Sequence, residues 1–182
     1  MIPLNLRTIL ISVLFLYCYL FPGSVYPDTQ TYDEYAIKTA FLFRSLHYVE
    51  WNSKNANNKL IVICVIEPDS FSKTIQSLSQ RTVSGRVIAL RNLESYTDVD
   101  ECDVLHIPMK SSSLLQQLLK TIENRNILTI SDHLGYAKNG VILNFPLEGQ
   151  KVSIEVNIDA ANRQNIKFSA KLLRIANIVG NK

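Results

Sequence analysis

The chain has 182 residues, of which 47% are hydrophobic, and a formal net charge of +3 at pH 7. This length suits a single domain, and the apolar content is enough for a core of ordinary size. Acidic and basic residues are interspersed, which argues against the clustered basic face of a nucleic-acid-binding protein.

The first 26 residues have the layout of a secretory signal peptide. Arg7 precedes the apolar run Ile9–Phe21, and Pro22-Gly23-Ser24 follows it. An uncleaved membrane anchor is the alternative, but the run is shorter than the roughly 20 residues that a membrane-spanning helix needs. We therefore expect a signal peptide over residues 1–26, a periplasmic location, and one domain over residues 27–182.

Residues 35–51 are expected to form a helix, because Asp33 can cap it and no Gly or Pro interrupts it. The apolar residues of this segment fall in two stripes at helical spacing. One stripe should cover a sheet. The other is either buried beneath loops or exposed to a partner or to a second copy of the chain.

The segment Leu60–Ile66 is continuously apolar, which is typical of a central parallel strand covered on both faces. Further strands are predicted at residues 87–90, 104–107 and 127–130. A short helix should begin near Ser70, and an amphipathic helix should span residues 111–123. Strands that alternate with helices indicate crossover units, so we expect an α/β fold with a mixed, largely parallel sheet and helices on both faces.

Residues 140–157 read as a C-terminal antiparallel hairpin that extends this sheet. A turn at Gly149-Gln150 sets Leu147 opposite Val152 and Leu143 opposite Val156, so one face is apolar throughout. A shift by one residue would place polar side chains on that face, and the register is therefore strongly specified. Beyond the hairpin, Asp159 can cap a short helix, and Ser169 can cap a last helix over residues 170–179 with Gly180 at its end.

Two groups of polar residues are candidates for a binding surface or pocket. The first lies on the polar face of the hairpin, where the side chains could instead bond backbone groups of loops or face water. The second is a small basic patch near the chain end, which could equally be a solvated helix face. The two groups are Asn144, Glu155 and Asn157, and Lys167, Ser169, Lys171 and Arg174.

No pattern in the chain predicts a catalytic residue, a metal ligand set or a cofactor site. Glu67-Pro68-Asp69 follows the first strand where a dinucleotide or phosphate loop would need glycines. His47, His106 and His133 are far apart in sequence. Asp132-His133 is a weak candidate for a base and its orienting acid, because adjacent side chains rarely point at one another.

Two cysteines, Cys64 and Cys102, remain after the signal peptide. Disulfides persist in an oxidising compartment, and adjacent parallel strands would bring the two Cα atoms to about 5 Å, within bonding range. The alternatives are two unpaired thiols, or a metal site completed by a histidine. We expect the disulfide.

Eight segments, taken in order, resemble the YfiR family of exported bacterial proteins. They cover nearly the whole of residues 35–174 and are Tyr35–Leu42 with Val49–Trp51, Ile63–Val65, Thr82–Arg86, Cys102 before Val104, Leu128–Asp132, Gly140–Phe145, Val152–Asn157 and Ser169–Arg174. Two positions depart from the family pattern. Phe41–Ser45 replaces a Phe-Leu-Tyr-Asn-Phe run, and Glu67 stands where a glycine is usual.

The resemblance implies a periplasmic regulator without enzymatic activity. Such proteins bind the periplasmic domain of an inner-membrane diguanylate cyclase, repress its synthesis of cyclic-di-GMP, and are sequestered by an outer-membrane lipoprotein. They also dimerise and depend on disulfides, here Cys64 with Cys102. A sensor kinase is another candidate partner. A periplasmic small-ligand sensor is the alternative function, and a hydrolase is the third.

Overall fold

The fold is seen in a computed structural model that describes residues 33–51, 59–66, 68–108 and 112–180. The expected signal peptide lies outside these residues. No helix in the described ranges is both long and apolar enough to cross a bilayer. The helices are α2 (Glu34–Leu46), α4 (Ser70–Ile75) with the 3₁₀ turn η1 (Gln76–Leu78), α5 (Ser112–Thr121), α6 (Ile158–Arg163) and α7 (Ala170–Leu173).

An eight-stranded mixed sheet forms the centre, with the strand order β12-β10-β7-β6-β5-β2-β4-β3. Its strands are β2 (Leu60–Val65), β3 (Thr82–Val83), β4 (Arg86–Asn92), β5 (Val104–His106), β6 (Leu128–Ser131), β7 (Leu143–Asn144), β10 (Glu155–Asn157) and β12 (Asn177–Val179). Neighbours from β4 to β7 are parallel, whereas β3 and β10 run antiparallel to β4 and β7. The predicted α/β class with a largely parallel sheet is confirmed.

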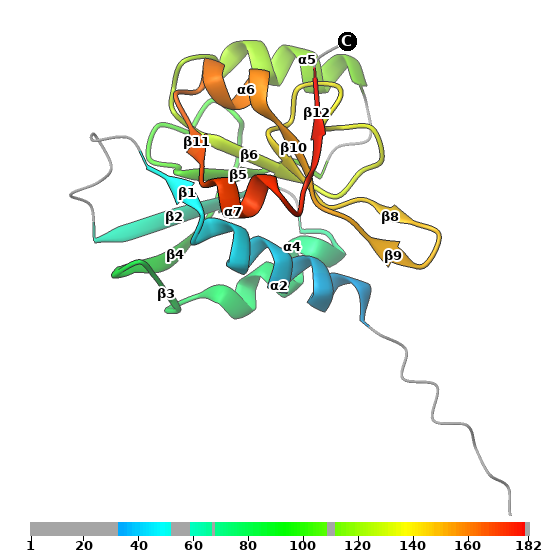
Figure 1. Cartoon of the computed structure of the whole chain (residues 1–182). Coiled ribbons are helices and arrows are strands. Elements are labelled where there is room, and N and C mark those ends of the chain that lie inside the picture. The colour runs from blue at the N-terminus through cyan, green and yellow to red at the C-terminus, as the bar shows by residue number, and fades with distance from the viewer. Residues whose placement is uncertain (1–32, 52–58, 67, 109–111, 181–182) are drawn as a thin grey trace, which may run out of the picture. The chain divides into compact units, whose positions relative to one another are not determined.

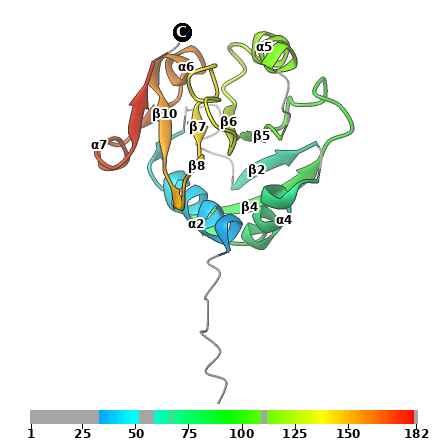
Figure 2. The same cartoon turned by 90° about the vertical axis from the view of Figure 1, so that its right-hand side faces the viewer.

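Helices cover both faces of this sheet. Helices α5 and α6 lie on one side, and α2 and α4 lie on the other (Figures 1 and 2). Side chains alternate along β2 accordingly: Ile61 and Ile63 join the cluster beneath α2 and α4, whereas Cys64 joins the cluster beneath α5. The continuous apolar run of this strand is thus explained by burial on both faces.

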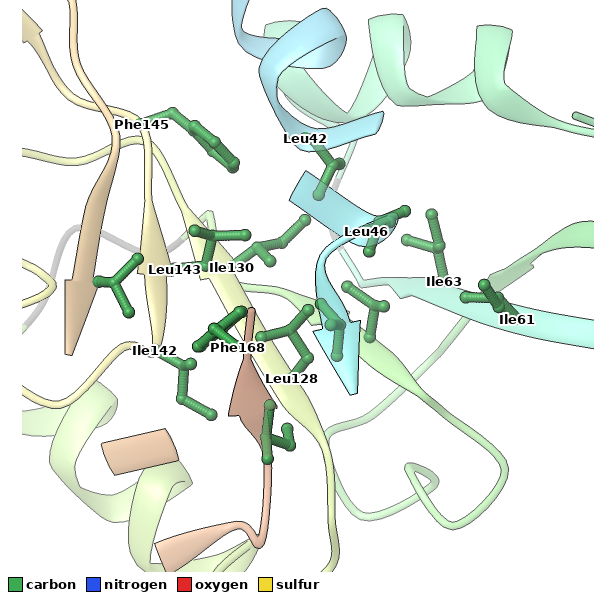
Figure 3. Close-up of a cluster of buried hydrophobic side chains, with 14 of the residues drawn as sticks. Leu42, Leu46, Ile61, Ile63, Leu128, Ile130, Ile142, Leu143, Phe145 and Phe168 are labelled. Carbon is green, nitrogen blue, oxygen red and sulfur yellow. The ribbon is translucent and has the colours of Figure 1, made fainter. Parts of the chain in front are cut away.

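The larger cluster gathers apolar side chains from distant parts of the chain (Figure 3). They come from α2, β2, β6, β7, β11 (Lys167–Phe168) and the two residues that flank β7. The labelled members are Leu42, Leu46, Ile61, Ile63, Leu128, Ile130, Ile142, Leu143, Phe145 and Phe168. This cluster fixes α2 against the sheet.

The first helix is shorter than predicted. Asp33 caps it by accepting a hydrogen bond of 3.1 Å from the Tyr35 amide, but the helix ends at Leu46. Val49 then enters β1 (Val49–Glu50), which pairs antiparallel with β11 and sets Val49 opposite Phe168. Pairing with a strand far along the chain therefore overrides the helical pattern of residues 47–51.

The hairpin has the predicted register but not one continuous ladder. Leu147 lies opposite Val152 in the pair β8 (Leu147–Glu148) and β9 (Lys151–Val152), and Leu143 lies opposite Val156 in the main sheet. Pro146 stands between the two ladders and has no amide hydrogen to donate, which explains the break. Gly149 has φ +64°, the left-handed conformation that the turn requires.

The predicted last helix is wrong beyond its first turn. Only Ala170–Leu173 is helical, and Asn177–Val179 forms β12, which extends the sheet in parallel with β10. The β-branched residues Ile178 and Val179 gain ladder hydrogen bonds there, so Gly180 follows a strand rather than ending a helix. In α6 the cap is Asn157, whose side chain accepts from the Ala160 amide, instead of Asp159.

Cys64 and Cys102 form the expected disulfide, with their Cα atoms 5.8 Å apart. Cys64 lies in β2, where it is the register partner of Leu105 in β5. Cys102 comes just before β5. The bond therefore ties two neighbouring parallel strands together beneath α5.

Candidate functional site

A group of polar side chains lies at one edge of the central sheet, where β2, β5 and β6 end. These three strands are parallel, so the residues that end or follow them meet at the same edge. Asp69 follows β2, His106 ends β5, and Asp132 follows β6. One ligand-type atom from each residue lies within 4.8 Å of the other two.

Asp69 is held in place by capping α4. Its Oδ1 accepts a hydrogen bond of 2.6 Å from the Ser72 amide, while the Ser72 hydroxyl accepts one of 2.8 Å from the Asp69 amide. This reciprocal capping box is the standard arrangement for an aspartate at a helix start. The second oxygen, Oδ2, faces His106 at 3.6 Å from Nε2.

His106 is fully buried beneath α4. Its ring packs edge to face against Phe71, with the ring centroids 5.4 Å apart. Neither ring nitrogen has a hydrogen-bond partner among the described residues. Burial lowers the pKa of His106, and the nearby His133 adds to that effect, whereas Asp69 and Asp132 oppose it.

Asp132 is paired with Lys38, which reaches the site from α2. The Lys38 ammonium donates a hydrogen bond of 2.7 Å to Oδ2 of Asp132 and also pairs with Glu34. Burial by itself would lower the pKa of Lys38, but the bonds to the two carboxylates outweigh burial and raise it. The lysine therefore stays charged and locks α2 to the end of β6.

The residues Asp132 and His133 engage different partners. Nε2 of His133 lies 2.7 Å from the carbonyl oxygen of Pro108, to which it donates. Its own carbonyl oxygen accepts a hydrogen bond of 2.8 Å from the Asn144 amide group. The two neighbours therefore do not act on one another as a base and its orienting acid.

The hairpin residues Asn144, Glu155 and Asn157, which the sequence singled out, make hydrogen bonds inside the domain. Asn144 donates to Oε2 of Glu155 at 2.9 Å, and Asn157 donates to the carbonyl oxygen of Ala137 at 2.7 Å. All three side chains of the predicted group are buried. Residues 132–140 cover this hairpin face, so Asn144, Glu155 and Asn157 offer a partner no exposed surface in this structure.

The second predicted group stays at the surface. Lys167 lies on β11, and Ser169 caps α7 by accepting from the Lys171 amide. The side chains of Lys167, Lys171 and Arg174 are exposed. Further along the chain, Ile175 and Ile178 are exposed by 63% and 52%. We call Lys171, Arg174, Ile175 and Ile178 the C-terminal surface.

The second apolar stripe of α2 is half-buried. Phe41 and Tyr48 pack against the core cluster and also line a cleft of about 260 Å³. Arg44 and Ser45, where the chain departs from the family pattern, line the same cleft. Ile175 also lines this cleft, so the cleft adjoins the C-terminal surface.

Sequence reasoning missed the grouping of Asp69, His106 and Asp132. The three lie far apart along the chain, and no short spacing links them. The available signal was topological, because each stands at the carboxyl end of a predicted parallel strand. Combining the strand predictions with this rule would have brought the three residues together.

A protein-family model described as YfiR/HmsC-like matches residues 35–177. Among solved structures, a conserved domain protein from Vibrio cholerae is similar with a TM-score of 0.50 and 12% identity, over 81% of this chain and 60% of that one. An ABC domain from Streptococcus pneumonia, solved in complex with L-Trp, has a TM-score of 0.52 and 11% identity, over 79% and 60%. At these identities the likeness concerns the fold alone, and the chain spans about 60% of the length of each structure.

Proposed function

The chain belongs to the YfiR/HmsC-like family, and from this membership we propose that it is a periplasmic regulator that binds an inner-membrane signalling protein and holds it inactive. The target that the family resemblance favours is a diguanylate cyclase, which would make cyclic-di-GMP the output. The regulator itself would be without enzymatic activity. It would act on the partner only by binding to it.

The C-terminal surface is the observation that supports this proposal. Ile175 and Ile178 are large apolar side chains that remain exposed, and the basic residues Lys171 and Arg174 lie in the same short stretch. Exposed apolar groups rimmed by charge are typical of protein interaction sites. The basic groups would favour an acidic patch on the partner and speed association.

The mechanism would be a shift in the partner's conformational equilibrium. A regulator that binds the inactive conformation more tightly than the active one moves the population toward inactivity by that difference in affinity. The Cys64–Cys102 bond ties β2 to the start of β5 and so limits motion of the domain that presents this surface. A second copy of the chain and an outer-membrane lipoprotein are further proposed partners.

Co-purification tests the proposal directly. The periplasmic domain of the diguanylate cyclase or sensor kinase encoded nearest to this protein is immobilised, and the purified protein is passed over it with and without reductant. We expect retention under oxidising conditions. If no such membrane partner retains the oxidised protein, the regulator function is wrong.

A matched pair of variants locates the contact. Ile175→Asp places a charge on the C-terminal surface and should weaken retention at least about tenfold, as loss of an interface anchor does. Leu114→Asp on α5 makes the same chemical change at another exposed position, 52% exposed, and should leave retention unchanged. Equal loss in both variants would place the contact elsewhere.

A further inference from the structure

We propose that Asp69, His106 and Asp132 form a binding site for one divalent zinc ion. This inference goes beyond the proposed regulatory function and does not depend on it. It also departs from the expectation drawn from the sequence, which placed no metal ligands in the chain. The side chains are a nitrogen donor and two carboxylates whose ligand atoms lie within 4.8 Å of one another.

The state of His106 is the first argument. A buried imidazole nearly always bonds through its ring nitrogens, because a polar group left unbonded in the interior loses its hydration without compensation. Both nitrogens of His106 lack such a partner among the described residues. Its Nε2 faces Oδ2 of Asp69, but 3.6 Å is too long for a hydrogen bond. A metal ion between Nε2 of His106 and Oδ2 of Asp69 would bond to both atoms.

The carboxylates are the second argument, since each can serve the fold and a metal ion at once. Asp69 uses Oδ1 to cap α4, and its Oδ2 is the oxygen that faces His106. Asp132 holds the Lys38 ammonium on Oδ2, which leaves its Oδ1 available to a metal ion. Binding would therefore require neither the cap nor the ion pair to break.

The local charge also favours a cation. Asp69, Asp132 and Glu34 contribute three negative charges around the site, and Lys38 offsets one of them. The neutral imidazole is the form of a histidine side chain that binds metals. A divalent ion would neutralise the remaining two charges.

The donor set selects the ion. Mg²⁺ and Ca²⁺ prefer sites made of oxygen atoms alone, whereas Zn²⁺ readily takes imidazole nitrogen together with carboxylate oxygen. In a tetrahedral zinc site the bonds of about 2.0–2.2 Å place ligand atoms about 3.5 Å apart. The three atoms therefore need to close by about 1.3 Å at most. Nε2 of His106 and Oδ2 of Asp69, at 3.6 Å, already have this spacing, so the movement would be made by Asp132.

Zinc titration of untagged protein tests the proposal. The protein is treated with a chelator, dialysed, and kept free of reductant so that the disulfide stays closed and thiolates cannot bind the metal. Isothermal titration with ZnCl₂ should show one Zn²⁺ bound per chain, and millimolar Mg²⁺ or Ca²⁺ should not displace it. The midpoint of thermal unfolding should rise in the presence of zinc.

Two variants assign the site. Asp69→Asn keeps the helix cap, because asparagine caps as well as aspartate, but removes the charged ligand. His106→Gln removes the nitrogen ligand. Each should weaken zinc binding at least about 100-fold. Loss of a residue that only hydrogen-bonds to a metal ligand weakens binding by about 100-fold at most. Control variants are His47→Gln and Asp98→Asn, which lie outside the cluster and should bind zinc as the unaltered protein does.

Several results would overturn the site. The first is that no zinc binds at a tenfold excess of ZnCl₂. The second is that folded Asp69→Asn protein binds zinc as tightly as the unaltered protein. The third is that the His47→Gln control loses zinc binding. If His106→Gln fails to fold, as judged by circular dichroism, Asp69→Asn decides the question alone. The cobalt(II) form gives an independent readout, since its visible bands should change in Asp69→Asn and remain in Asp98→Asn.

Discussion

Lys38 on α2 and Asp132 at the end of β6 are joined by a hydrogen bond of 2.7 Å, and their side chains are only 3% and 10% exposed. Removing one member of a buried ion pair leaves the other charge unpaired and typically costs about 3–5 kcal/mol. We expect Lys38→Met to lower the free energy of unfolding by about 3 kcal/mol. Urea denaturation followed by circular dichroism measures this loss.

The exposed pair of Arg125 with Asp100 provides the control for this prediction. Asp100 is 81% exposed, so water and salt screen the interaction. Arg125→Met should change the free energy of unfolding by less than about 1 kcal/mol. A loss in Lys38→Met no larger than that of Arg125→Met would contradict the stabilising role of the buried pair.

The disulfide should account for a large part of the stability. Cys64 and Cys102 are separated by 38 positions, and closing a loop of this length is worth roughly 4 kcal/mol on the chain-entropy model. Reduction should lower the free energy of unfolding by about that amount. Urea curves with and without reductant give the value, and mass spectrometry should show a gain of two hydrogens. Coincident curves after confirmed reduction would contradict the expectation.

Leu172 and Ile175 distinguish the observed C-terminal structure from a continuous helix. A helix over residues 170–179 would bury both side chains, but the structure buries Leu172 and exposes Ile175 by 63%. Leu172→Ala should therefore cost about 3 kcal/mol. Ile175→Ala should cost less than about 0.5 kcal/mol, as surface substitutions do. Similar costs in urea denaturation would favour the continuous helix.

Asn157 should matter far more to α6 than Asp159 does. Its side chain caps the helix through a bond of 2.8 Å from the Ala160 amide and donates to the carbonyl oxygen of Ala137. Asn157→Ala removes both bonds and should cost about 2 kcal/mol. Asp159→Ala, at an exposed position, should cost less than about 1 kcal/mol. Thermal and urea unfolding compare the two, and a larger cost for Asp159→Ala would contradict the assignment of the cap.

The parts of the fold that the sequence predicted well are those determined by local pattern. The apolar run Leu60–Ile66 indicated a buried parallel strand, and the hairpin register followed from alternation about Gly149. In both places only one arrangement buries the apolar side chains. The Cys64–Cys102 bond was also within reach, because it depends on the pairing of those same strands.

The errors lie where pairing with distant residues decides the outcome. Val49 leaves its helical pattern to pair with Phe168, and Ile178 leaves its own to pair with Val156. Helical periodicity in a short segment carries no information on such partners. The grouping of Asp69, His106 and Asp132 was missed for the same reason, since only the sheet brings them together.

The pairing of β1 with β11 has a consequence for how the chain acquires its fold. Val49 follows the first described helix, whereas Phe168 lies near the end of the described chain, and both belong to the cluster that anchors α2. Contacts between such remote segments slow folding, because a long loop must close before they form. As the chain emerges N-terminus first from the ribosome, α2 appears long before β11, which helps to complete its docking site. The native domain can therefore form only after β11 has been made, and apolar surface of α2 that is exposed until then would favour aggregation.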